Sequence, residues 1–252
     1  MVKNILAFDL SPTGIRASIS NGGIITKDYS YAFTSALDYK IKEQLKEFVE
    51  ENGLKQLEVD DIALSWSHPH SALLPMNVFN DSDKESIYTL SFGELETGVT
   101  TDYNRLPQHG IVNVYAVSDW LKSFFVMNFP RVIMQHEGTL LIRQLFAHSS
   151  VRPKAIVSIH QNHFLLAITQ NNDLKFYNYF EYTNAEDMIY YIGFAMQQMQ
   201  ISPADVELIL NASQGCELDL QLVKTYYSQL NQPRTEVQVV EHYLTKAIEL
   251  CV

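Results

Sequence analysis

Apolar and polar residues follow the same order of segments twice along this chain. Shifting the sequence by 149 positions lays residues 8–38 over residues 157–187 without a gap. Each copy has an apolar run, a polar turn, a run of alternating residues, a second turn rich in Gly or Asn, and a third run. Period-two alternation indicates a strand with one buried face, and Gly and Asn accept the positive φ that tight hairpins need. The pattern therefore predicts three hairpin-linked strands in each copy.

A helix is predicted next in each copy, because apolar residues recur there at i, i+4 spacing. Thr34 or Ser35 is expected to cap the first helix and Gly53 to stop it, while Thr183 or Asn184 is expected to cap the second. The apolar stripes consist of Leu37, Ile41, Leu45, Phe48 and Val49 in the first helix and of Met188, Ile192, Ala195, Met196 and Met199 in the second.

A final strand follows each helix and completes a βββαβ unit. The strand covers residues 61–66 in the first copy and 205–210 in the second, so the offset between the copies becomes 144. We therefore expect an α/β protein whose two diverged units form two lobes, residues 1–150 and 151–252. Residues 68–117 have no counterpart in the second copy and are expected to form a small inserted subdomain.

The segments outside the repeat carry further elements. Apolar periodicity and the turn residues between the runs set their limits. The predicted elements are a helix over 81–90, strands over 98–105 and 108–117, a helix from 119 that ends before Pro130, a strand over 131–135, a helix over 138–147, a helix over 217–230, a strand over 236–240 and a short terminal helix.

The overall charge argues against one class of partner. The formal net charge is −11 and no run of Lys or Arg occurs, so we expect no nucleic-acid partner, whose affinity comes largely from clustered cations. No apolar stretch approaches the ~20 residues that span a bilayer, and the apolar run within the first ten residues is too short for a signal peptide. Cys216 and Cys251 lie outside any C-x-x-C spacing, which argues against a zinc site. We expect a cytoplasmic protein.

Three stretches resemble the actin-like ATPases. Residues 7–14, AFDLSPTG, resemble their first phosphate-binding turn, and residues 112–146 followed by 154–180 are similar to the pilus-assembly and FtsA-type members. The stretch LLPMNVF, which ends at Phe79, resembles the Val-Pro-x-x-x-Phe element of a bacterial domain-of-unknown-function family assigned to this fold. The resemblance implies a duplicated, ribonuclease H-like fold. That family implies no activity by itself.

The resemblance also implies where a nucleotide site would lie. Actin-like proteins hold ATP between two turns, with an acid in each turn near Mg²⁺ and a Gly-containing third loop. Asp9 matches the first acid, Ser11 stands where Gly is usual, and Thr13 keeps a hydroxyl, whereas Pro12 has no N–H to offer a phosphate. The turn either faces a metal and phosphate, or Asp9 ends a strand and caps its own turn.

The second turn and the third loop depart further from that pattern. Ser158 stands at the position of the acid and His160 at that of the Gly. His160 and His163 are spaced i, i+3 on a turn-to-strand segment, so we expect their side chains on opposite faces rather than as a metal-binding pair. Ser213 and Gly215 belong to the third loop, which either receives an anion at a helix N-terminus or is an ordinary turn.

These residues predict an actin-like protein whose nucleotide site is degenerate. We expect a binding or scaffold role with an unidentified protein partner, no catalytic residue and no bound metal. The alternative is a nucleotide-binding ATPase with ATP and Mg²⁺ at Asp9 and Thr13. Residues 175–182, KFYNYFEY, place aromatic side chains on both faces of a predicted strand, so one face enters the core and the other is either a partner surface or covered by a helix.

Overall fold

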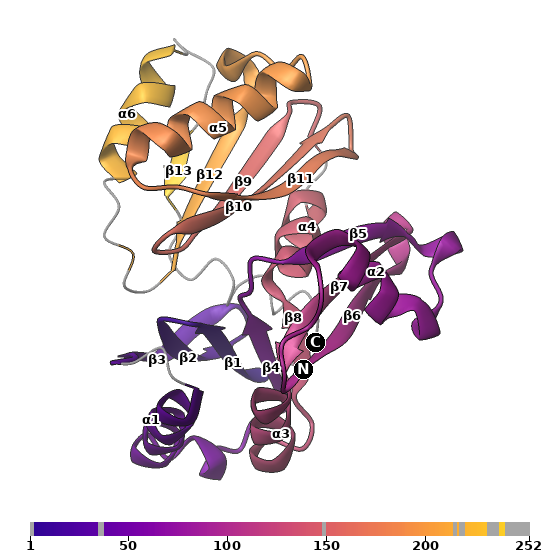
Figure 1. Ribbon diagram of the computed structural model, residues 1–252. Coiled ribbons are helices and arrows are strands. Elements are labelled where there is room, and N and C mark those ends of the chain that lie inside the picture. The colour runs from indigo at the N-terminus through magenta and orange to yellow at the C-terminus, as the bar shows by residue number, and fades with distance from the viewer. Residues whose placement is uncertain are drawn as a thin grey trace. The chain divides into compact units, whose positions relative to one another are not determined.

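The computed structural model describes residues 3–34, 38–147, 150–213, 216, 220–230 and 237–239. The chain divides into two compact units between Leu140 and Leu141, called unit 1 and unit 2 below. Each unit contains one five-stranded sheet, and unit 1 also contains a three-stranded sheet (Figure 1). The lobe limits expected near residue 150 and the limits of the inserted subdomain stay predictions.

The five-stranded sheet of unit 1 has the order β3-β2-β1-β4-β8. Its strands are β1 Asn4–Ser11, β2 Gly14–Asn21, β3 Ile24–Ala32, β4 Asp61–Trp66 and β8 Ile133–His136. The first three strands are antiparallel, whereas β4 runs parallel to β1, and β8 runs parallel to β4. The turn between β2 and β3 contains Gly22 and Gly23 at φ 57° and 83°, as the hairpin prediction requires.

Unit 2 repeats this topology with the order β11-β10-β9-β12-β13. Its strands are β9 Lys154–Ile159, β10 His163–Gln170, β11 Asp173–Glu181, β12 Glu207–Ala212 and β13 Val237–Val239. Asn171 and Asn172 adopt φ of 55° and 60° in the turn between β10 and β11. Asn tolerates this left-handed conformation better than most residues, so the second hairpin forms without glycine.

The internal repeat is confirmed at the level of individual residue pairs. Leu10 pairs with Ile15 between β1 and β2, and the residues 149 positions later, Ile159 and Phe164, pair between β9 and β10. A register shift after Ile19 in β2 has its counterpart after Ile168 in β10. The two units therefore share strand order, ladder register and bulge position. The predicted duplicated α/β fold is correct.

The predicted position of the last strand in the second copy was wrong by two residues. Trp66 lies beside Leu10 in unit 1 and Ala212 lies beside Ile159 in unit 2, so the offset here is 146 rather than 144. Residues 203–205 form a 3-10 turn before the strand. A slip of two residues keeps every side chain on its own face of the sheet, so the alternating pattern cannot reveal it.

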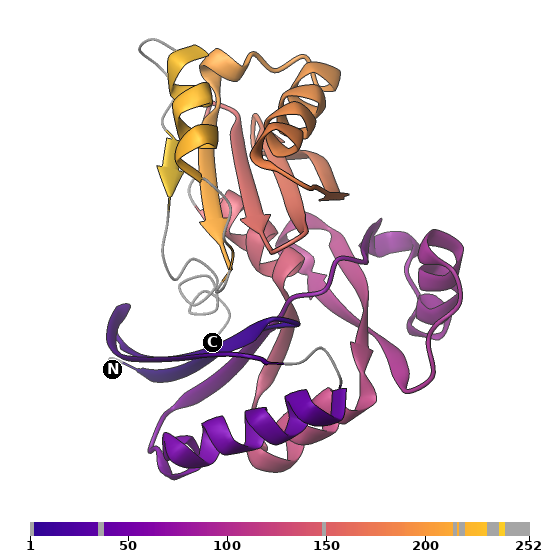
Figure 2. The same ribbon diagram turned by 60° about the vertical axis from the view of Figure 1, so that its left-hand side comes forward.

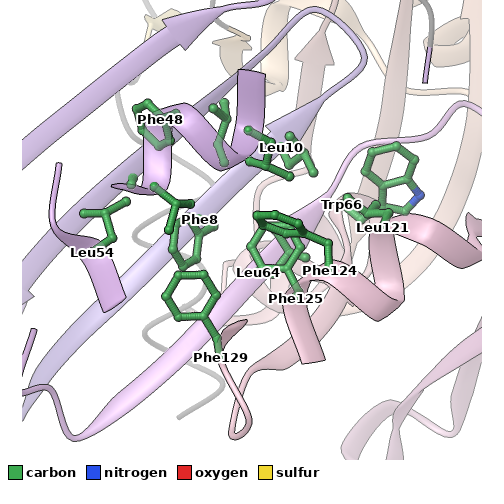
Figure 3. Packing of buried hydrophobic residues seen from close by; sticks show 14 of the residues in the cluster. Phe8, Leu10, Phe48, Leu54, Leu64, Trp66, Leu121, Phe124, Phe125 and Phe129 are labelled. Atoms are coloured by element: carbon green, nitrogen blue, oxygen red, sulfur yellow. The ribbon is translucent and has the colours of Figure 1, made fainter. Parts of the chain in front are cut away.

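Two helices cover one face of the large sheet in unit 1 (Figure 2). They are α1 Asp38–Glu51 and α3 Asp119–Asn128. Phe8 and Leu10 of β1 point into the core between the sheet and these helices (Figure 3). The ring centroid of Phe8 lies 5.3 Å from that of Phe125 and 4.8 Å from that of Phe129. Full burial of one such side chain contributes about 1.5–3 kcal/mol, so this cluster is a main source of stability in unit 1.

Helix α1 ends as its sequence predicts. Gly53 follows it in the left-handed conformation at φ 61°, which a residue with a Cβ adopts only at a cost. At the other end, the Thr34 backbone N–H donates to Gln44 Oε1 over 3.1 Å. The alternative cap, Ser35, lies outside the described residues.

The three-stranded sheet of unit 1 has the order β5-β7-β6 and packs against helix α2. Its elements are β5 Ser71–Pro75, α2 Lys84–Phe92, β6 Val99–Leu106 and β7 Ile111–Ser118. The sequence did not reveal β5, because Pro75 argues against a strand. The structure places Pro75 at the last position of an edge strand, where a missing N–H is tolerated.

Helices α5 Ala185–Gln198 and α6 Leu220–Leu230 cover one face of the unit 2 sheet (Figures 1 and 2). Asn184 caps α5 by accepting a hydrogen bond from the Asp187 N–H at 2.9 Å, as predicted. From β11, Phe180 stacks on Tyr191 of α5 at 5.0 Å, so this face of the aromatic strand belongs to the core.

Helix α4, Glu137–Ala147, follows β8. Among the helices of the described residues, none has the length and apolar character that crossing a membrane requires. The predicted terminal helix lies outside the described residues.

Candidate functional site

The predicted site residues follow the carboxyl ends of parallel strands. Strands β1, β4 and β8 are parallel in unit 1, and β9 and β12 are parallel in unit 2. Ligands of open α/β sheets bind outside these ends, where the connecting turns meet. The predicted residues in the described ranges lie in turns or strand ends of this kind: Asp9, Ser11 and Thr13 in unit 1, and Ser158, His160 and Ser213 in unit 2. Gly215 lies outside the described residues.

The first turn, residues 9–14, is a two-residue hairpin in which Ser11 pairs with Gly14. The Thr13 N–H points at Ser11 Oγ over 3.4 Å, and the hydroxyls of Ser11 and Thr13 are 3.0 Å apart. Ser11 Oγ is also within 3.3 Å of the Gly14 carbonyl oxygen. The hydroxyls and the Thr13 backbone donor thus interact within the turn, and Pro12 contributes no further donor.

Asp9 lies on the face of the sheet opposite the hydrophobic core. It neighbours Ser65 of β4 in register, while Phe8 and Leu64 alternate with them and enter the core. The hydroxyls of the buried Ser65 and Ser67 have no hydrogen-bond partner among the residues that the structure describes. This edge of unit 1 therefore places the half-buried carboxylate of Asp9 beside hydroxyl groups that can still donate, while the fully buried Glu137 begins α4 directly after β8.

A buried polar network surrounds His136 at the end of β8, and the sequence reasoning missed it. His136 Nδ1 accepts from the Gly138 N–H at 3.0 Å, and Nε2 donates to the His68 carbonyl oxygen at 2.8 Å. These two partners fix the neutral tautomer with its proton on Nε2. One signal was available, because Asn113 interrupts an apolar strand and a buried amide needs partners.

Two asparagines hold this network to the three-stranded sheet. Asn104 Oδ1 accepts from the His136 backbone N–H at 2.8 Å and from the Thr139 hydroxyl at 3.1 Å. Asn113 Nδ2 donates to Thr139 Oγ1 at 3.0 Å and lies 3.3 Å from His136 Nδ1. Side-chain hydrogen bonds from Asn104 of β6 and Asn113 of β7 thereby connect both strands to the start of α4.

His68 completes this part of unit 1. Burial, together with smaller effects of the nearby His136 and His70, lowers the pKa of His68 from 6.5 to about 4. Its Nδ1 accepts the His70 backbone N–H at 3.2 Å. The ring of His68 is therefore neutral near pH 7, and its Nδ1 lone pair is engaged by the backbone.

In unit 2, Ser158 occupies the strand position that Asp9 holds in unit 1. Ser158 lies beside Asn211 of β12, as Asp9 lies beside Ser65, and it is fully buried. Asn211 Nδ2 approaches Ser158 Oγ at 3.5 Å. A neutral hydroxyl and a neutral amide thus stand at this edge of unit 2.

The two histidines of the second turn, residues 158–163, lie together, which corrects the prediction that they face opposite ways. The rings of His160 and His163 stack at 4.6 Å with an interplanar angle of 14°. The His160 N–H donates to the His163 carbonyl oxygen at 2.8 Å, so the two residues close a tight turn. Residues i and i+3 of a β-turn lie across from each other, whereas the prediction treated the segment as extended.

Tyr182, which directly follows β11, holds the second turn in place with two hydrogen bonds. Its hydroxyl donates to the His160 carbonyl oxygen, and its backbone N–H donates to the Asn162 carbonyl oxygen at 3.0 Å. Burial raises the pKa of Tyr182, with Cys216 adding to the shift, so the phenol keeps its proton. These two hydrogen bonds from Tyr182 hold the second turn against the end of β11.

The third loop begins at the end of β12. The Ser213 N–H donates to the Ile159 carbonyl oxygen at 2.7 Å, and the Cys216 N–H donates to the Ser213 carbonyl oxygen at 3.3 Å. The buried Ser213 Oγ has no hydrogen-bond partner within the described ranges.

The model of the family described as protein of unknown function (DUF3822) matches residues 2–230. This chain belongs to the DUF3822 family. Among curated proteins, none matches this DUF3822 chain.

Solved structures share the fold of this DUF3822 chain. A Bacteroides thetaiotaomicron protein with an actin-like ATPase fold and unknown function superposes with a TM-score of 0.83 at 16% identity, over 99% of this chain and 96% of that one. PilM in the PilM–PilN type IV pilus biogenesis complex has a TM-score of 0.59 at 10% identity, over 98% of each chain. The chain therefore has the actin-like ATPase fold that the sequence resemblance implied.

Proposed function

We propose that this protein is a binding or scaffold protein of the bacterial cytoplasm that uses an actin-like fold with a degenerate nucleotide site. The observation that carries the proposal is the neutral Ser158, beside Asn211, at the strand position that Asp9 holds in unit 1. An actin-like site uses an acid in both turns to hold hydrated Mg²⁺. Loss of one charged contact of this kind costs about 1.5–3 kcal/mol.

Features of both turns indicate that phosphate would bind only weakly. In the first, the Thr13 N–H is directed at Ser11 Oγ, and Pro12 has no N–H. In the second, the stacked rings of His160 and His163 stand where glycine lets backbone approach a phosphate. Together with the missing acid, these changes account for a loss of about 4 kcal/mol, the difference between micromolar and millimolar affinity.

A protein partner is proposed because the fold serves association elsewhere. PilM, which shares the fold, forms a complex with PilN. A partner for this chain would bind its surface without the nucleotide chemistry of the two turns. No nucleic acid is proposed, since the chain carries a net charge of −11.

The second candidate is a nucleotide-binding ATPase. It is favoured by the half-buried Asp9 beside Ser65, whose hydroxyl has no partner among the described residues. A phosphate-release assay separates the two candidates. We expect the wild-type protein with Mg-ATP to release phosphate no faster than the Asp9→Ala variant. Release that depends on Asp9 would favour the ATPase.

A further inference from the structure

Each unit has a groove between the two helices that cover its large sheet. In unit 1 a groove of about 500 Å³ lies between α1 and α3, and we call it the unit 1 groove. In unit 2 a groove of about 490 Å³ lies between α5 and α6, the unit 2 groove. Helices α1 and α5 both connect the third and fourth strands of their sheets, so the two grooves occupy equivalent places in the duplicated fold.

The unit 1 groove combines an apolar floor with positive charge. Tyr39, Phe124 and Met127 supply apolar surface, and Tyr39 and Met127 are 60% and 80% exposed. Large apolar side chains with such exposure line the same groove, which is typical of a protein-binding surface. The lining also includes Lys42, Lys46 and Lys55.

These lysines are largely available to a partner. Lys42 and Lys55 form no ion pair among the described residues, and Lys46 lies 4.0 Å from Glu50 in an exposed contact worth little. Among the described lining residues, Glu43 is the one that carries a carboxylate. A local excess of cations is notable in a chain that has 18 Lys and Arg against 29 Asp and Glu.

The unit 2 groove has a similar volume, but the charge of its described lining residues is negative. Its lining includes Tyr190, Phe194, Leu222 and Tyr226, with Glu186 as its charged residue and no Lys or Arg among the described lining. The cations of the unit 1 groove are therefore not a consequence of the duplicated architecture. They distinguish one groove from an otherwise comparable one.

We propose that the unit 1 groove docks an acidic amphipathic helix of a protein partner. This inference rests on the binding role proposed above and names its surface. A helix laid between two helices buries its apolar stripe in the groove, and Asp or Glu at the margin of the stripe meets Lys42, Lys46 and Lys55. Helix α1 is 14 residues long, or about 21 Å, which fits three to four turns of a partner helix.

A matched pair of labelled peptides tests the proposal. Both have about 18 residues, roughly 27 Å as a helix, and the same Leu and Phe stripe. One carries Glu on its polar face, and the other carries Lys. Fluorescence anisotropy with the full-length protein should show at least about tenfold tighter binding of the Glu peptide. Added salt should reduce this difference, because exposed charges are screened.

Two protein variants locate the binding. The Lys42→Glu/Lys55→Glu double variant should lose the preference for the Glu peptide, and Met127→Asp should weaken both peptides. Phe194→Asp in the unit 2 groove is the control and should change neither affinity. All four positions are exposed, so the fold is retained; tryptophan fluorescence checks unit 1, and circular dichroism checks unit 2 for Phe194→Asp.

Several results would overturn the proposal. The peptide results are equal affinity for both peptides, no binding of either, or binding that Phe194→Asp abolishes. A dimer in light scattering that dissociates in the lysine double variant would assign the groove to a second copy of the chain. Titration of the same variants with Mg-ATP is an independent readout. Absence of both peptide and ATP binding would reject the groove while leaving the degenerate nucleotide site standing.

Discussion

The indole Nε1 of Trp66 donates a hydrogen bond to the Ala116 carbonyl oxygen at 3.1 Å. Trp66 ends β4 of the five-stranded sheet and Ala116 belongs to β7, so this bond connects the two sheets of unit 1. We expect Trp66→Phe to lower the free energy of unfolding by about 1–3 kcal/mol, because a buried carbonyl loses a partner and the core loses volume. Urea unfolding followed by the fluorescence of Trp120 measures this.

Trp120→Phe is the matched control. The Trp120 Nε1 is buried without a hydrogen-bond partner among the described residues, so its removal sacrifices no bond. The control variant should unfold with a smaller loss of stability, as reported by Trp66. Equal losses in both variants would mean that the Trp66–Ala116 bond contributes nothing.

A pH dependence is expected from His68. Burial lowers the pKa of His68 from 6.5 to about 4 in the folded state. The unfolded chain therefore binds more protons between these values, and the stability due to neutral His68 is present above pH 6.5 and is lost as the pH falls toward 4. The loss amounts to at most about 3 kcal/mol.

Comparison with His68→Asn isolates this contribution from other titrating groups. Urea unfolding of unit 1, monitored by tryptophan fluorescence, should depend less on pH between 7 and 5 in the variant than in the wild-type protein. Parallel curves for the two proteins would show that His68 is not protonated differently in the folded and unfolded states.

Two glycine substitutions should act in opposite directions. A Cβ on Gly14 would lie 2.7 Å from the Tyr31 carbonyl oxygen, a backbone atom in β3 that cannot move alone. Gly14→Ala is therefore expected to cost about 1–3 kcal/mol. A Cβ on Gly193 in α5 would meet Tyr227 Oη at 3.6 Å, an ordinary contact, so Gly193→Ala should gain up to about 1 kcal/mol of helix propensity.

Circular dichroism during urea unfolding reports on both glycine variants, because unit 2 contains no tryptophan. Destabilisation by Gly193→Ala would contradict the contact geometry of α5 against α6. A neutral Gly14→Ala variant would show that β2 and β3 separate at little cost.

The fold was predictable where local chemistry repeats. The turns at Gly22 and Asn171, and the alternation in the strands that they join, specify the hairpins in both units. The position of β12 was not predictable, since a two-residue slip leaves the alternation intact. Strand β5 was not predictable, because it contains Pro75. A proline is tolerated at the end of an edge strand, but the sequence does not indicate which strand lies at an edge.

The candidate site was predictable as positions along the chain rather than as interactions. Asp9 and Ser158 occupy equivalent strand positions, as the repeat implied. The stacking of His160 on His163 and the bond from Gly138 to His136 depend on turn closure and on contacts between segments distant in sequence. Such contacts leave no periodic signal in a single sequence.

Calorimetric titration of the full-length protein with Mg-ATP tests the central claim, that the nucleotide site is degenerate. With neutral Ser158 in place of an acid and Pro12 in the first turn, we predict a dissociation constant in the millimolar range or weaker, which corresponds to about 4 kcal/mol of binding free energy at most. The Asp9→Ala variant should give the same heats as the wild-type protein. Micromolar affinity that Asp9→Ala abolishes would contradict the account and establish the protein as a nucleotide-binding member of the actin-like fold.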